Sequence, residues 1–311
     1  MYIKKQQGIP AIPAELKQTF ANKFTLNIGK TEIIKRKNNN NLTERDVKIA
    51  KFLFQFRFAT AEQIHTFLNE QSSIENLRGR LEKLTHSRIL NKFMLGDYEE
   101  DEIPTDAFEV YCLDLGGRYL LTNFSNEDTT DWYSAINMVS SEIVNKTLFT
   151  VDFYLRLRET MGNRLIYFKA EPIFRCGKKT IIPSFNFCIK DGSINRNYIG
   201  EIVRDFDFPL YAREKAEKLE QLLMTNAWKK YFYEDLEPPV LFVFTENDDN
   251  ALEVGKLYAC TTEIERFRIS TDERIQIPLH EGGAFLKYVV EQNMLKKVKS
   301  STFAPITNTE Q

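Results

Sequence analysis

Three consecutive stretches near the N-terminus each carry a hydroxyl side chain within their first two residues and continue with apolar residues at helical spacing. In LTERDVKIAKFLFQF, Thr43 precedes Asp46 by three residues, which is close to the pattern of a capping box. The next stretch, ATAEQIHTFLN, opens at Thr60, and SSIENLRGRLEKLTHSRIL opens at Ser72 or Ser73. Because apolar residues recur every three or four positions in all of them, we predict three amphipathic helices in succession.

Two strand-like stretches, ILNKFML and AFEVYCLDL, follow the third helix, and the acidic loop GDYEEDEIPTD joins them. Three helices followed by a two-stranded hairpin form a winged helix-turn-helix, which we place at residues 42–125. Residues 1–41 contain prolines and lysines and end in KRKNNNN. We expect a basic, partly flexible arm there, with one short ordered piece around AELKQTFANKF.

Charge is unevenly distributed along the chain, although the net charge is only −2. Residues 1–95 contain seventeen Lys and Arg against eight Asp and Glu, whereas residues 96–135 contain one Arg against eleven acids. A basic N-terminal third suits a surface that binds phosphates, because the release of counterions drives such binding. The alternative is a solvated basic face beside a solvated acidic loop.

The polar face of the third helix supplies the candidate DNA contacts, because Asn and Arg pair bidentately with adenine and guanine edges in the major groove. Some of these side chains could instead hold phosphates, or form ion pairs on a solvated face. The predicted DNA-binding residues are Asn76, Arg78, Arg80 and Lys83 on this helix, Lys92 in the wing, and Lys35, Arg36 and Lys37 in the arm.

Residues 133–299 predict a second, α/β domain built on a mixed sheet. A long helix at 133–161 precedes the strands RLIYFKAEPIF, TIIPSFNFCI and YIGEIVRDF, a helix from about 211 to 228, and the strand PPVLFVFTE. We expect the last of these strands to pair in parallel, because it follows a helix. A helix at ALEVGKLYA, a strand at RFRISTDERIQI and a helix over 283–299 complete the domain, and residues 300–311 are expected to form a loose tail.

The strand YIGEIVRDF raises the question of nuclease chemistry. Metal-dependent nucleases hold Mg²⁺ between acids on adjacent strands. If this domain is active, its catalytic acids are Glu171 and Glu201, and its metal ligands are Glu171, Asn186 and Glu201. However, Asn186 stands where an aspartate would serve, and Val203 occupies the position two residues after Glu201 where a lysine is wanted. The alternative is that Glu201 is a buried acid paired with a lysine such as Lys215.

These motifs resemble the replication-relaxation family of plasmid and mobile-element proteins. The resemblance rests on LTERDVKIAKFLFQFRFATAEQI, LRGRLEKLTHSRIL and LGGRYLL, then on IIPSFNFCI, GEIVR and YAREKAEKLEQLL with PPVLFVFTE, and it covers residues 42–260. It implies a winged helix followed by a degenerate restriction-endonuclease-like domain of the PD-(D/E)XK type. It also implies sequence-specific binding of double-stranded DNA in plasmid or mobile-element replication, copy control or conjugative transfer.

We therefore expect a bacterial, cytoplasmic DNA-binding protein without catalysis or cofactor, acting as a homodimer and in contact with plasmid replication or transfer proteins. Mg²⁺ would be needed only under the alternative of a DNA-nicking enzyme. A further alternative is an adaptor that recruits a relaxase or replisome. No GxxxxGK[ST] or GxSxG motif occurs, and no apolar run approaches the length of a membrane span. The four cysteines form no CxxC pair and are expected to be buried thiols.

Overall fold

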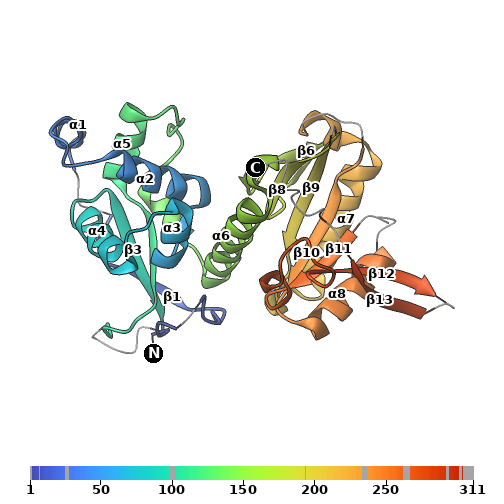
Figure 1. Cartoon of the computed structure of the whole chain (residues 1–311). Coiled ribbons are helices and arrows are strands. Elements are labelled where there is room, and N and C mark those ends of the chain that lie inside the picture. The colour runs from blue at the N-terminus through green and yellow to red at the C-terminus, as the bar shows by residue number, and fades with distance from the viewer. Residues whose placement is uncertain are drawn as a thin grey trace. The chain divides into compact units, whose positions relative to one another are not determined.

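The chain divides into two compact units, Met1–Leu155 and Arg156–Gln311. The computed structural model in Figure 1 describes residues 2–6, 8–24, 28–97, 103–192, 194–232, 237–261, 267–291, 294–300 and 303. Each unit combines helices with a sheet, as the α/β prediction requires. No helix in the described part of the chain is long and apolar enough to cross a membrane.

The three predicted helices of the first unit are present: α2 (Glu44–Phe56), α3 (Ala61–Leu68) and α4 (Ile74–His86). Thr43 and Thr60 each form a capping box with the residue three positions later, and the Ser73 side chain caps α4. Their inward residues form the core under the helices, including Phe52 and Leu81. These helix starts are local signals, which explains why the sequence locates them correctly.

A four-stranded antiparallel sheet completes this module, with β1 (Lys17–Phe20), β3 (Leu90–Gly96), β4 (Glu109–Leu113) and β2 (Phe58–Ala59) side by side in that order. The predicted hairpin of the wing is β3 and β4. Residues 98–102 of its acidic loop lie outside the described residues.

Parts of the predicted arm that the structure describes belong to the fold of the first unit. Strand β1 lies in the piece that was expected to be ordered, and it pairs with β3 from Lys17 to Phe20. Ile12 is buried with Phe58 and Phe93 in one core cluster. The helix α1 (Lys30–Asn38) buries Ile33. Nonlocal strand pairing and apolar burial therefore hold a segment whose local composition suggests a loop.

The predicted long helix at 133–161 is interrupted. A short 3₁₀ helix, Ser134–Asn137, precedes α6 (Ser141–Met161), after α5 (Leu115–Phe124) has ended. Asn137 is buried, and its side-chain amide donates to the carbonyl of Leu113 at 2.9 Å. The backbone N–H of Val139 donates to the side chain of Gln18 at 2.9 Å. These tertiary hydrogen bonds replace the helical ladder at the break.

The second unit contains a seven-stranded mixed sheet in the order β13-β12-β11-β10-β9-β8-β5. Its strands are β5 (Leu165–Ala170), β8 (Phe185–Asp191), β9 (Ile194–Ile202), β10 (Val240–Thr245), β11 (Phe267–Thr271), β12 (Phe285–Glu291) and β13 (Met294–Ser300). Strand β10 runs parallel to β9 and β11, as predicted, and the other pairs are antiparallel. The prediction of a helix over 283–299 is wrong, because β12 and β13 form an antiparallel hairpin there.

Two helices, α7 (Leu210–Met224) and α8 (Asp248–Thr261), pack together and share a core cluster with one face of this sheet. A small hairpin of β6 (Phe174–Cys176) and β7 (Lys179–Ile181) joins the same cluster. The other face is rich in aromatic rings. A Cβ at Gly200, the first residue of the GEIVR stretch, would lie 2.0 Å from the buried ring of Phe185, so a larger residue there would require that ring to move.

Three cysteines are buried, as predicted: Cys112, Cys176 and Cys188. Cys260 corrects that prediction, because its thiol is free and exposed near the end of α8. Burial raises the pKa of the Cys112 thiol well above its usual range. Cys260 is therefore the accessible thiol of the described cysteines.

Candidate nucleic-acid interface

Helix α4 has a buried face and an exposed face. Leu77, Leu81 and Leu84 point into the core of the first unit. Four residues at helical spacing line the opposite face and are exposed: Asn76, Gly79, Lys83 and His86. The helix therefore presents a continuous outward stripe, three turns long, that the fold itself does not use.

Arg80 anchors the first half of α4 and does not belong to that stripe. Its Nε donates to Asp46 Oδ1 at 2.9 Å, and its Nη2 donates to the Asn41 carbonyl at 2.9 Å. The Asp46 side chain is fully buried and also accepts from the backbone N–H of Thr43 at 2.7 Å. The hydrogen bond to Asp46 raises the pKa of the Arg80 guanidinium. Arg80 thus ties α4 to the start of α2, and its contact with DNA stays a prediction.

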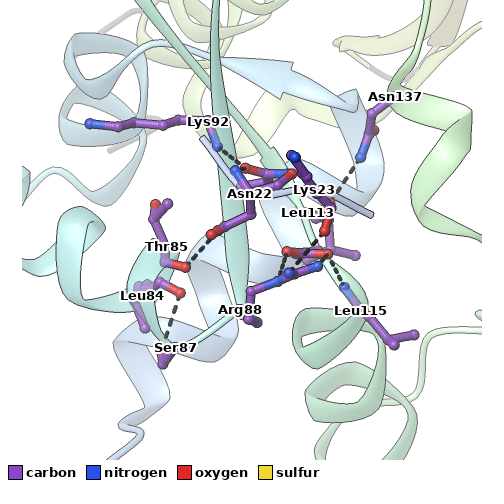
Figure 2. Close-up of polar contacts among 12 residues, drawn as sticks. Asn22, Lys23, Leu84, Thr85, Ser87, Arg88, Lys92, Leu113, Leu115 and Asn137 are labelled. Atoms are coloured by element: carbon purple, nitrogen blue, oxygen red, sulfur yellow. Dashed lines mark hydrogen bonds and ion pairs between the residues drawn. The ribbon is translucent and has the colours of Figure 1, made fainter. Parts of the chain in front are cut away.

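A second polar cluster anchors the last turn of α4 (Figure 2). The side-chain amide of Asn22 donates to the Thr85 carbonyl at 2.9 Å, and Arg88 donates to the Lys23 carbonyl at 3.0 Å. Arg88 also pairs with the buried carboxylate of Asp114 at 2.6 Å. Asp114 in turn accepts from the backbone N–H of Leu115 at the start of α5. Hydrogen bonds that are at most partly buried therefore hold α4 at its middle, through Arg80, and at its last turn, through Thr85.

The glycine pair of the LGGRYLL stretch serves the same anchor. A Cβ at Gly116 would lie 2.6 Å from the Arg88 carbonyl oxygen, and one at Gly117 would lie 2.4 Å from the Ile89 carbonyl oxygen. Both contacts are with backbone, which cannot move aside as a flexible side chain can. The first turn of α5 therefore packs directly on the turn that ends α4.

Lys92 in the wing is committed to ion pairs. Its ammonium contacts Glu109 at 2.8 Å and also pairs with Glu82 of α4, and its side chain is 16% exposed. Burial would lower the pKa of Lys92, but its hydrogen bonds to both carboxylates raise it overall. The lysine thus fastens the wing to α4, and its contact with a phosphate stays a prediction.

The other predicted cations differ in whether they already form ion pairs within the protein. Arg78 pairs with Glu62 of α3, but its side chain is 40% exposed, and such surface pairs contribute little. On α1, Arg36 pairs with Glu32 and Lys37 pairs with Glu44.

Lys35, also on α1, is exposed. Neither it nor Lys83 forms an ion pair with the residues that the structure describes. Those two lysines are therefore the predicted cations whose charge is available.

Gly79 lies at the centre of the outward stripe and was not singled out from the sequence. A Cβ there would meet nothing within 4 Å, and its φ is not in the left-handed region. Glycine inside a helix costs about 0.8–1 kcal/mol relative to alanine. The available signal was a glycine in the middle of an amphipathic helix. Its place leaves the middle of the stripe flat, between Asn76 on one side and Lys83 on the other.

The predicted nuclease residues lie in the second unit, where Glu201 on β9 is almost fully buried. The Ser184 hydroxyl donates to Glu201 Oε1 at 3.4 Å, and the Lys215 ammonium from α7 lies 3.3 Å from the same oxygen. Lys215 also donates to the Ile182 carbonyl at 2.7 Å. The prediction of a buried acid paired with Lys215 is confirmed. Burial opposes the charge of Lys215, but attraction to Glu201 and Tyr211 raises its pKa overall.

The other predicted residues of this site are not gathered around Glu201. Ser184, rather than Asn186, lies across from the carboxylate, and the Asn186 amide donates to the Tyr167 hydroxyl at 3.3 Å. Glu171 is exposed, and its backbone N–H donates to the Ser184 carbonyl at 2.9 Å. The Val203 side chain is buried in the core under α7 and α8.

This donor set does not fit a divalent cation. Its one buried carboxylate already faces an ammonium group, and its other near neighbour is the neutral hydroxyl of Ser184, whereas Mg²⁺ is usually held by one or two carboxylates together with waters. Among the described residues, no group of three or more His, Cys, Asp or Glu side chains is placed to hold a metal ion. We therefore derive no reaction step for the Glu201 region.

No family model matches the chain, and no curated protein matches it. Among solved structures, restriction endonuclease FokI shows a similarity that covers 83% of this chain and 53% of that protein, with 11% sequence identity and a TM-score of 0.30. The chain thus spans about half the length of that enzyme. The resemblance to the replication-relaxation family stays a prediction.

Proposed function

We propose that this protein binds double-stranded DNA through the outward face of α4. The observation that supports the proposal is the stripe of Asn76, Gly79, Lys83 and His86, which is exposed while other residues anchor the helix at its middle and its last turn. A rigid helix with an uncommitted polar face is what major-groove recognition requires.

The distribution of side chains along α4 gives each a role. Asn76 lies in the first turn, where recognition helices contact base edges, and an asparagine amide can pair with adenine N6 and N7. Lys83 lies two turns later, roughly 10 Å along the axis, where it would hold a phosphate. Gly79 between them would let the helix backbone approach the groove closely. Lys35 on α1 is a second candidate phosphate contact.

The biological setting follows from the resemblance of the sequence. We propose that binding serves plasmid or mobile-element replication, copy control or conjugative transfer, without catalysis by this chain. The second unit would then contribute through its shape and surface rather than through bond cleavage. The buried pair of Glu201 and Lys215 supports that division of roles, because it occupies the predicted catalytic position with a neutralised acid.

A binding selection from a random-sequence duplex pool, followed by mobility shifts on the enriched duplexes, tests the proposal. We expect discrete shifts with the wild type that are lost when Asn76→Ala and Lys83→Ala are combined. Lys178→Ala, which removes an exposed lysine from the second unit, is the matched control and should leave the shifts unchanged. Absence of any enrichment by the wild type, or equal losses in both variants, would refute an interface on α4.

The same protein should be incubated with supercoiled plasmid and Mg²⁺ to test the alternative of nicking. We expect intact plasmid with the wild type. Nicked product that disappears in Glu201→Ala would show that the second unit is a working nuclease and would overturn the non-catalytic part of the proposal.

A further inference from the structure

Helix α7 carries an exposed stripe that does not face its own core. Leu210 and Met224 lie at its two ends and are 82% and 63% exposed. They are two heptads apart, so they share one side of the helix, and Arg213 and Glu217 lie between them on that side. Its buried side, which includes Ala216 and Leu219, packs on the sheet instead. The stripe thus carries an exposed apolar side chain at each end and charged side chains between them.

A groove of about 590 Å³ borders this stripe on the side of α8. Its walls include Arg213 and Glu217 from α7 and Lys256 and Cys260 from α8, and Phe208 and Leu257 give it an apolar lining. Figure 1 shows α7 and α8 together in the second unit. The surface therefore offers both protruding apolar side chains and a recess beside them.

The exposed charges on this surface include one cation and one anion that could pair with the same two charges in reversed order. Arg213 and Glu217 are one helical turn apart, yet within the described ranges neither forms an ion pair, with the other or with any neighbour. Lys256, in contrast, already pairs with Glu253 at 2.8 Å. A surface with one available cation and one available anion a turn apart suits a partner with the same two charges in reversed order.

We propose that the occupant of this surface is the α7 surface of a second copy of the chain. In an antiparallel pair of α7 helices related by a two-fold axis, Arg213 of each copy faces Glu217 of the other. Leu210 of each copy then lies opposite Glu220 of the other helix, one turn before its end at Met224, and the groove receives part of its flank. An isologous contact of this kind closes on itself and forms a dimer rather than a chain of molecules.

This inference does not depend on DNA binding, because it rests on α7 and α8 alone. It adds to the proposed function only in that two copies of α4 in one particle would suit a DNA site with two half-sites.

Sedimentation velocity of the full chain over a range of concentrations tests the proposal. We expect a reversible dimer in the wild type. Arg213→Glu and Glu217→Arg should each raise the dimer dissociation constant by at least about tenfold, because each places like charges together. Mixing Arg213→Glu with Glu217→Arg should give a heterodimer, because opposite charges then face each other at both contacts.

Lys178→Glu is the matched control, because it reverses an exposed charge elsewhere in the second unit and should not change the dissociation constant. Leu210→Asp should also abolish the dimer, and thermal unfolding of each variant checks that its fold is intact. A wild type that stays monomeric at every concentration would overturn the proposal. A dimer that withstands both charge reversals and Leu210→Asp would show that the interface lies elsewhere.

Discussion

Both units bury an acidic side chain against a cation from a neighbouring helix, and the two pairs differ in how closely the acid is held. Asp46 in the first unit accepts hydrogen bonds from Thr43 at 2.7 Å and from Arg80 at 2.9 Å. Glu201 in the second unit has longer contacts, 3.3 Å to Lys215 and 3.4 Å to Ser184. Asp46 is thus part of a tight junction between helices, whereas Glu201 rests in a looser polar site.

The difference shows how a polar residue can be misread. Arg80 lies on the polar side of an amphipathic helix, as a DNA contact would, yet it serves the junction with α2. Glu201 lies on a strand, as a catalytic acid would, yet an ammonium group neutralises it. Lys83 on α4 and Arg213 on α7, in contrast, have no such partner among the residues that the structure describes.

The largest expected effect is on the tighter pair. Arg80→Ala leaves the fully buried Asp46 without its cation, so we expect the free energy of unfolding to fall by about 3–5 kcal/mol. Urea unfolding measures this change. Lys83→Ala on the same helix is the control and should change the free energy of unfolding by less than about 0.5 kcal/mol. Equal stabilities of the two variants would show that the Arg80 pair contributes nothing to the fold.

The looser pair should respond less. Lys215→Met leaves the carboxylate of Glu201 buried beside Ser184, and we expect the free energy of unfolding to fall by about 2–3 kcal/mol. Glu201→Gln should cost less than Lys215→Met, because it removes the buried charge instead of leaving it unpaired. If Glu201→Gln is the more harmful of the two, a role for the charge beyond this pair is indicated.

Acid should weaken the ion pairs that Glu109 forms with Lys92 and with Lys5. Burial alone would raise the pKa of Glu109, but Lys92 and Lys5 lower it below the ordinary value of 4.5. The folded protein thus holds this carboxylate in its charged form more strongly than the unfolded chain does. Its contribution is present above pH 4.5 and is lost as the pH falls through the folded pKa.

We expect that contribution to be about 1 kcal/mol after screening by the solvent. Urea unfolding at a series of pH values, in the wild type and in Glu109→Gln, measures it. The difference in unfolding free energy between the two proteins should shrink below pH 4.5. A difference that stays constant across that range would rule out Glu109 as its source.

The smallest expected effect concerns Gly79. Gly79→Ala adds a methyl group into open space, so the free energy of unfolding should rise by about 0.5–1 kcal/mol. If the helix backbone approaches DNA closely, the same variant should bind the selected duplex more weakly. More stable protein with unchanged DNA binding would show that Gly79 does not set the distance between α4 and the groove.

The sequence predicted elements whose signals are local. The caps at Thr43, Thr60 and Ser73 mark helix starts through residues only three positions apart. It did not predict the docking of residues 2–6 and 8–24, because the pairing of β1 with β3 joins residues far apart in the chain, from Lys17 with Gly96 to Phe20 with Phe93. The sequence analysis predicts a helix over 283–299, where β12 and β13 pair as a hairpin, although Phe285, Val289 and Val290 are residue types that favour strands.

The candidate site was predicted as a helix face but not residue by residue. Periodicity places Arg80 and Lys83 on the polar side of α4 but does not reveal which of them meets a buried acid from another helix. That distinction arises from the position of Asp46 at the start of α2, where one carboxylate both caps its helix and binds Arg80. The tertiary partner of Arg80 therefore distinguishes it from Lys83, which periodicity alone does not.

The salt dependence of duplex binding tests the central claim most directly. Fluorescence anisotropy with a selected duplex would compare the wild type with Lys83→Ala and with the control Lys178→Ala over a range of salt concentrations. The account predicts that Lys83→Ala weakens binding and reduces the slope of log affinity against log salt by about one, whereas the control matches the wild type. An unchanged slope in Lys83→Ala would contradict the assignment of α4 as the surface that meets DNA.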